Sequence, residues 1–145
     1  MPQLTFPISA DGLCADVRVN LDSTGLASLH ASDQPVPPSI EAKGLIDTGT
    51  DISVVAPFIL QQLGVQVHSQ RKTQGIGGQI QIRLFQVTLF ILDKAQPQLP
   101  WFIVPDLLVM ETPSALPVEV LIGMDVIRTC KLLVDGPGQQ FTLDF

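Results

Sequence analysis

The sequence predicts a single all-β domain that contains one or two short helices. Its 145 residues are enough for one domain with a substantial core, since 46% of them are apolar and only 15% are charged. Valine, isoleucine and leucine recur in short blocks between 11 glycines and 12 prolines, which is typical of strands joined by turns. Because no internal repeat or linker divides the chain, we expect residues 1–145 to form one domain.

The charge balance and the composition argue against several classes of partner. With 8 basic and 14 acidic residues the net charge is -6, which disfavours binding to duplex DNA or anionic lipid. A chain with no tyrosine and a single tryptophan also lacks platforms on which single-stranded nucleic acid stacks. We therefore expect a protein that binds neither nucleic acid nor membrane.

Targeting and metal-binding patterns are missing from the sequence. No apolar run approaches the ~20 residues that span a bilayer, and the N-terminal segment lacks the basic and apolar regions of a signal peptide. The two cysteines, Cys14 and Cys130, form neither a CxxC motif nor a cysteine–histidine metal pattern. These observations predict a soluble, cytoplasmic protein with reduced thiols and no metal.

Residues 1–40 are predicted to form an N-terminal arm and a hairpin. Leu4–Ile8 has the pattern of a short strand, and apolar side chains alternate along Ala15–Leu21. Asp22–Gly25 predicts a turn, after which Leu26–His30 returns as the second strand of the hairpin. Three prolines make residues 32–39 an irregular loop.

The middle of the chain predicts strands around one short helix and a long hairpin. Ala42–Ile46 and Ile52–Val55 are apolar strands, and Ala56–Gly64 has proline in the first turn and glycine just past the end of a helix. A long hairpin with the glycine-rich tip Gly75-Ile76-Gly77-Gly78 follows, and its predicted strands are Val65–Gln74 and Gln79–Leu92.

The last third of the chain predicts short strands and a second short helix. Trp101–Val104 is a strand, and Pro105–Pro117 is an irregular surface excursion. The remaining predicted elements are a strand over Val118–Ile122, a helix over Met124–Thr129 and a closing hairpin made by Lys131–Val134 and Phe141–Phe145.

The most informative motif is Asp47-Thr48-Gly49, which follows an apolar strand directly. Gly49 allows a close approach of the backbone, and the Thr48 hydroxyl can lock the turn by hydrogen bonding. Taken alone, the tripeptide favours an ordinary turn in which the aspartate caps its own loop. Its apolar flanks, however, place the carboxylate on a buried loop, where an unpaired charge would be costly.

Two further motifs accompany this turn. In Val118–Asp125 two large apolar residues precede Gly123, and an acidic residue then opens a helix. With the glycine-rich tip, the three segments resemble the retropepsin-like aspartic proteases in order and in rough spacing, and Phe141–Phe145 is similar to the last strand of that family. The motif-bearing core would span residues 44–145. Ile80 stands where a dinucleotide fingerprint needs a third glycine, so the tip is not a nucleotide-binding loop.

The resemblance implies a single-lobe acid-protease β-barrel and a role for each motif residue. Asp47 would be the catalytic carboxylate, Thr48 would bond across to the partner's loop, and Gly49 would present its carbonyl to the substrate. Thr50 would donate a hydrogen bond to the ionised form of Asp47. Because such a bond favours the ionised form, we expect the enzyme's pH optimum on the acidic side of neutrality. The tip would close over bound peptide as a flap. The implied substrate-binding residues are Asp51, Val54, Gly75, Ile76, Gly77, Gly78, Leu121 and Ile122.

Simpler interpretations of these residues stay open. Asp51 fits a solvated turn, the glycine-rich tip fits a plain flexible hairpin, and the apolar residues fit an ordinary core. The sequence also departs from viral members of the family, which have an arginine where Met124 stands and pair it with the acidic residue that Asp51 matches. That pair is absent here, so the edge of the dimer must be held in another way.

One Asp-Thr-Gly per chain implies two chains per active site. Hydrolysis by carboxylates needs one ionised group to take a proton from water and one protonated group to polarise the scissile carbonyl. A two-fold axis supplies the second carboxylate, because an isologous contact places identical residues opposite each other. We therefore expect a homodimer that needs no cofactor.

These features predict an aspartic endopeptidase that hydrolyses peptide bonds in extended segments of peptide or protein substrates. The first alternative is a catalytically silent homodimeric peptide-binding module with the same fold, although such a module has no need for an intact Asp47-Thr48-Gly49. The second alternative is a precursor whose N-terminal arm must first be trimmed.

Overall fold

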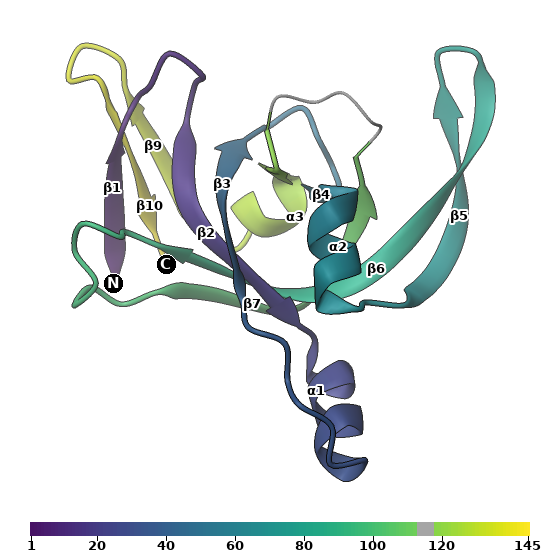
Figure 1. Cartoon of the computed structure of the whole chain (residues 1–145). Coiled ribbons are helices and arrows are strands. Elements are labelled where there is room, and N and C mark those ends of the chain that lie inside the picture. The colour runs from purple at the N-terminus through teal and green to yellow at the C-terminus, as the bar shows by residue number, and fades with distance from the viewer. Residues whose placement is uncertain (113–117) are drawn as a thin grey trace.

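A closed β-barrel forms the body of the protein (Figure 1). The structure is a computed structural model that describes residues 1–112 and 118–145. Its 7-stranded sheet has the order β2-β3-β8-β4-β7-β6-β5, and the additional pairing of β2 with β6 closes all of these strands except β5 into the barrel. The strands are β2 (Cys14–Leu21), β3 (Ile40–Ile46), β4 (Val54–Val55), β5 (Val67–Gly75), β6 (Gly78–Leu92), β7 (Phe102–Glu111) and β8 (Val120–Ile122).

A second, 3-stranded sheet joins the two ends of the chain, with the order β1-β10-β9. Its strands are β1 (Gln3–Pro7), β9 (Lys131–Asp135) and β10 (Gln140–Asp144). Leu4 is fully buried, and the Phe6 ring stacks on Phe141 with centroids 5.3 Å apart. The N-terminal arm is therefore part of the hydrophobic core, and its removal would expose apolar surface. This argues against the alternative in which the arm is trimmed.

Two of the helices lie where the sequence predicts them. In α2 (Pro57–Leu63) the proline occupies the first turn, and the left-handed Gly64, with φ of 70°, ends the helix. Its buried residues are Ile59, Leu60 and Leu63. α3 (Met124–Ile127) is shorter than predicted. No helix among the described residues is long and apolar enough to cross a membrane.

The hairpin predicted within residues 1–40 is wrong. Its expected second strand belongs to a helix, α1 (Ser23–Ala31), which projects from the barrel (Figure 1). Asp22 does not make a hairpin turn but caps this helix, since its side chain accepts the Gly25 N–H at 3.1 Å. β2 pairs with β3 on one side and with β6 on the other, so neither edge of β2 is open to a returning strand.

The irregular excursion predicted over Pro105–Pro117 is also wrong for the part that the structure describes. β7 continues to Glu111, and residues 113–117 lie outside the described part of the chain. Pro105 and Asp106 lie opposite Thr88 alone, because the register of β6 and β7 shifts there. A bulge of this kind accommodates a proline inside a strand. Asp106 has φ of 52° and accepts the Ser23 N–H at 2.8 Å.

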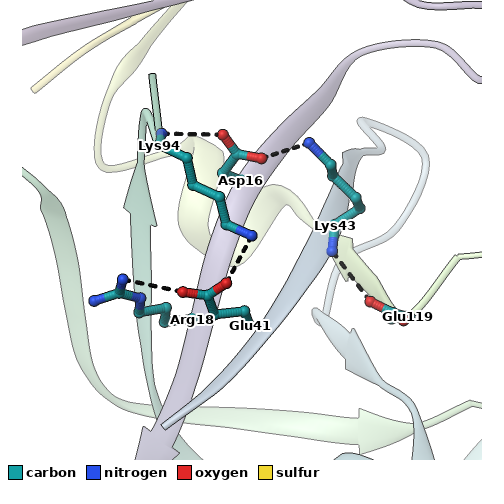
Figure 2. A network of polar contacts seen from close by, with 6 residues as sticks. All are labelled: Asp16, Arg18, Glu41, Lys43, Lys94 and Glu119. Carbon is teal, nitrogen blue, oxygen red and sulfur yellow. Dashed lines mark hydrogen bonds and ion pairs between the residues drawn. The ribbon is translucent and has the colours of Figure 1, made fainter. Parts of the chain in front are cut away.

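Six charged residues form a network over β2, β3 and the end of β6 (Figure 2). Asp16 is buried and bonds the Lys43 ammonium and, at 3.1 Å, the Lys94 backbone N–H. Glu41 accepts Arg18 at 3.1 Å and Lys94 at 2.8 Å. Glu119 accepts the Lys43 N–H at 3.2 Å and so ties the start of β8 to β3.

Asp16 makes this network sensitive to acid. Burial by itself raises the pKa of Asp16, but the hydrogen bonds from Lys43 and Lys94 and the positive charges of these lysines together hold the pKa below its ordinary value of 3.8. A carboxyl whose pKa is lower in the folded state stabilises the fold above its unfolded pKa. That stabilisation is lost as the pH falls through the folded pKa.

We predict that Asp16→Asn lowers the free energy of unfolding at neutral pH by about 1–3 kcal/mol, because a charged hydrogen-bond acceptor is lost from a buried site. The deficit relative to the wild type should shrink as the pH falls below 3.8 and through the lowered folded pKa of Asp16, because the protonated carboxyl loses its charge in the wild type too. Urea unfolding across this pH range measures both effects.

Glu41→Gln is the matched control, since it removes a carboxylate from the same network at a side chain that is 49% exposed. We expect a smaller loss of stability, because water screens exposed ion pairs. Equal losses in the two variants would show that the burial of Asp16 is unimportant.

Candidate active site

Asp47 lies at the point where β3 leaves the barrel. The parallel pairing of β3 with β8 ends at Ile46 opposite Ile122, and the Asp47 N–H then donates to the Ile122 carbonyl at 2.9 Å. The carboxylate thus stands at the carboxyl ends of two adjacent strands. β3, which is held by its pairing with β8, extends to Ile46, the residue immediately before Asp47.

Both carboxylate oxygens of Asp47 are held by its own turn. The Gly49 N–H donates to Oδ1 at 2.9 Å, and the Thr50 hydroxyl donates to Oδ2 at 2.7 Å, as predicted for Thr50. The Thr50 N–H also donates to the Asp47 carbonyl at 3.3 Å. These donors fix the plane of the carboxyl group and satisfy its ionised form. Asp47 is half-buried, whereas Thr48, Gly49 and Asp51 are exposed.

The second predicted segment packs directly against this turn. The Met124 N–H donates to the Thr50 carbonyl at 2.7 Å, and the Asp125 N–H donates to the Asp51 carbonyl at 3.2 Å. A Cβ on Gly123 would lie 2.7 Å from the Thr50 carbonyl oxygen, so only glycine fits there. Backbone hydrogen bonds thus hold the loop where Met124 stands in place of the viral arginine.

The sequence did not identify Ser53 and Asp125 as interacting residues of the site. Ser53 is buried, and its backbone N–H and hydroxyl donate to the Asp125 carboxylate at 2.8 and 2.6 Å. The signal in the sequence is a lone serine within the apolar run 52–55, since a buried hydroxyl needs a partner. The partner itself is 72 residues away and cannot be read from local pattern.

The apolar residues predicted to line the substrate site divide into two groups. Ile122 belongs to the hydrophobic core, and Val54 is buried opposite Leu121 in the pairing of β4 with β8. Leu121 is half-buried. Of these three, Leu121 therefore has the most surface left for a ligand.

The glycine-rich tip closes the β5–β6 hairpin as predicted. Gly75 pairs with Gly78, and the Ile76 side chain between them is completely exposed. Gly78 has φ of 118°, which L-residues with a side chain rarely adopt. In Figure 1 this hairpin projects beyond the barrel, and its tip stands apart from the turn that follows β3.

A groove of about 310 Å³ lies between the β5–β6 hairpin and β7 and reaches Ile52 and Asp125, but no residue of the turn 47–51 lines it. It is lined by Ile52, Arg71, Leu84, Pro105, Asp106, Leu107, Leu108 and Asp125. A larger groove, of about 760 Å³, lies beside Asp16 and Lys43, and Asp47 is not among the residues that line it. Among the described residues, no three His, Cys, Asp or Glu side chains could hold a metal ion.

Comparisons with known proteins agree with this architecture. A search of curated proteins finds no match. The solved structure of a retropepsin-like aspartic protease from Rickettsia conorii superposes with a TM-score of 0.60 at 12% identity, covering 99% of this chain and 90% of that one. At this identity the likeness concerns the fold alone.

Two other solved structures are similar with lower scores. The simian foamy virus (mac) protease gives a TM-score of 0.44 at 13% identity, covering 78% of this chain and 91% of that one. The retroviral protease-like domain of Ddi1 from Leishmania major gives 0.46 at 15% identity, covering 91% and 89%. The sequence model of the retroviral aspartyl protease family matches residues 15–135. This match covers most of the chain, including the barrel, the hairpin and the Asp47 turn, and the chain therefore belongs to the retroviral aspartyl protease family.

Proposed function

We propose that the protein is an aspartic endopeptidase in which Asp47 of one chain and Asp47 of a second copy activate a water molecule between them. The observation that carries this proposal is the double anchoring of the Asp47 carboxylate by Gly49 and Thr50. A carboxyl group held in one plane by its own turn is preorganised for proton transfer.

The reaction needs the two carboxyl groups in different protonation states. Like charges ~3 Å apart do not both ionise, so the pair shares one proton. The ionised carboxylate takes a proton from water, whose oxygen adds to the scissile carbonyl carbon, while the protonated group donates to the carbonyl oxygen. Return of a proton to the amide nitrogen then breaks the C–N bond.

Residues around Asp47 suit the remaining tasks of such a site. Thr48 is exposed, as is required for a hydroxyl that bonds to the partner's loop across the two-fold axis. Gly49 and Asp51 are exposed on the same turn, where a carbonyl and a carboxylate can bind the backbone of an extended peptide. Leu121 and Ile76 offer apolar surface to its side chains, and the hairpin tip would cover the bound segment.

We predict that Asp47→Asn abolishes cleavage of a peptide library, to less than about one part in a thousand of the wild-type rate, because both the acid and the base of the pair depend on this residue. Cleavage products identified by mass spectrometry measure the effect. Asp135→Asn is the matched control, since the Asp135 carboxylate also accepts a glycine N–H in a turn, at 2.9 Å.

Cleavage by Asp47→Asn at more than about one part in a thousand of the wild-type rate would contradict the proposed role of Asp47. A wild type that binds peptides without cleaving them would instead support the silent binding module. Isothermal titration with peptides from the library separates the two cases.

We predict that specific activity falls when the wild-type protein is diluted, since each site needs two chains. Adding an excess of Asp47→Asn chains should suppress the remaining wild-type activity, because mixed dimers hold only one intact carboxyl group. Analytical ultracentrifugation run beside the activity titration gives the fraction of dimer. Monomers that keep full specific activity would refute a shared site.

We predict that Gly78→Ala lowers kcat/KM by roughly tenfold, because strain at positive φ costs about 1–3 kcal/mol and falls on the tip that covers the bound segment. The same strain should lower the melting temperature by only a few degrees. Gly136→Ala, in the turn between β9 and β10, is the control, since Gly136 has no positive φ. A Cβ at either position would meet no described atom within 4 Å, so packing is equal. Equal rates in the two variants would make the tip a passive turn.

A further inference from the structure

The Asp125 carboxylate accepts hydrogen bonds with both of its oxygens. Oδ2 accepts the Ser53 N–H at 2.8 Å, and Oδ1 accepts the Ser53 hydroxyl at 2.6 Å and the Val126 N–H at 2.9 Å. An ionised carboxylate is an acceptor only, so all of these donors are satisfied by one charge. Such charge-assisted bonds are stronger than neutral ones and hold a single geometry.

Ser53 also forms a hydrogen bond with Gly123. While its hydroxyl donates to Asp125, the same oxygen accepts the buried Gly123 N–H at 2.9 Å. Ser53 is 1% exposed, so water does not compete for these groups. The hydroxyl therefore fixes the distance between the start of β4 and the end of β8.

Gly123 lies one step from the catalytic turn. The ideal Cβ position of Gly123 is 2.7 Å from the Thr50 carbonyl oxygen, and the next residue, Met124, donates its N–H to that oxygen at 2.7 Å. The hydroxyl of Thr50 in turn holds Oδ2 of Asp47. Hydrogen bonds thus link Asp125 to Ser53, Ser53 to Gly123, and the adjacent Met124 to Thr50, whose hydroxyl bonds Asp47.

We propose that Asp125, acting through Ser53, is a positioning residue that sets the orientation of the Asp47 carboxyl group. This role presupposes the peptidase activity proposed above. Asp125 is itself engaged by Ser53 and Val126 and touches no reacting atom. It acts by fixing where the Thr50 carbonyl and hydroxyl stand.

Asparagine does not reproduce all of the hydrogen bonds of Asp125, because it has one acceptor oxygen and one NH₂ group of the same shape. If its oxygen faces the Ser53 hydroxyl and the Val126 N–H, the NH₂ group faces the Ser53 N–H, and this buried donor is unsatisfied. In the opposite orientation the oxygen accepts the Ser53 N–H, but the Ser53 hydroxyl loses its acceptor and the Val126 N–H keeps only its bond to the Gly123 carbonyl. In either orientation the hydroxyl or the N–H of Ser53 loses the acceptor that holds it.

The test compares Asp125→Asn, Ser53→Ala and the control Asp93→Asn. Asp93 is a fair control because its carboxylate also accepts N–H groups, from Ala95 at 2.9 Å and from Gln96 at 3.0 Å, in a loop outside the catalytic turn. For Asp125→Asn we expect kcat to fall roughly 10- to 100-fold, the loss that a ~1 Å misplacement produces, with KM nearly unchanged. Asp93→Asn should keep the wild-type kcat.

The effects of Asp125→Asn and Ser53→Ala on kcat should not be independent. Because Ser53 and Asp125 act as one unit, the double variant should lose little more activity than the worse single variant. If the fold-loss in kcat of the double variant equals the product of the two single losses, the proposal that Asp125 acts through Ser53 is wrong. A folded Asp125→Asn with the wild-type kcat would also overturn it. Should Asp125→Asn not fold, Ser53→Ala, which removes one hydroxyl, decides in the same way.

A measurement that needs no activity separates this proposal from the proposed function. In NMR spectra of the full chain, the amide resonances of Gly49 and Thr50 should move in Asp125→Asn and stay in place in Asp93→Asn. Unmoved resonances would refute the positioning role even if the wild type is an active peptidase. A wild type as inactive as Asp47→Asn would refute the peptidase, while moved resonances would still show that Asp125 positions the turn.

Discussion

The hydrogen bond from the Asp47 N–H to the Ile122 carbonyl is the constraint on which the site depends. It exists because β3 and β8 run parallel and end together, although the paired residues Gly44 and Val120 are 76 positions apart in the sequence. Parallel neighbours leave their last residues at one edge of a sheet, where loops carry polar groups on a rigid support. The turn after β3 and the helix after β8 therefore meet, and Gly44, whose Cβ would lie 2.8 Å from Ile122, allows the two strands to pack this closely.

Other parts of the molecule serve to keep these two strands in place. The barrel closes through β2 and β6, and Lys43 bonds Asp16 on one side and Glu119 on the other. β3 is thereby tied to both of its neighbours, β2 and β8, by side chains as well as by backbone. Most hydrogen bonds at the Asp47 turn come from backbone groups, which leaves Thr48, Gly49 and Asp51 exposed for other partners.

Sequence reasoning found what is encoded locally and missed what depends on tertiary pairing. Apolar alternation and glycine positions located most of the barrel strands, α2 and the β5–β6 hairpin, and the Asp-Thr-Gly turn together with two later motifs indicated the family. Asp22 was misread because a helix cap and a hairpin turn favour the same residue types. Pro105 was misread because a bulge between two strands is invisible in either strand alone. The pairing of Asp125 with Ser53 was missed because the two residues are 72 positions apart and meet only in the folded chain.

The pairing of β1 with β10 has a consequence for how the protein is made. The hydroxyls of Thr5 and Thr142 are 2.9 Å apart although 137 residues separate them. Contacts this distant in sequence close a very long loop and form late. During translation, Leu4 and Phe6 have no complete partner surface until the final strand leaves the ribosome. β1 therefore stays unpaired from its own synthesis until that of β10, and its apolar side chains are exposed to aggregation during this interval.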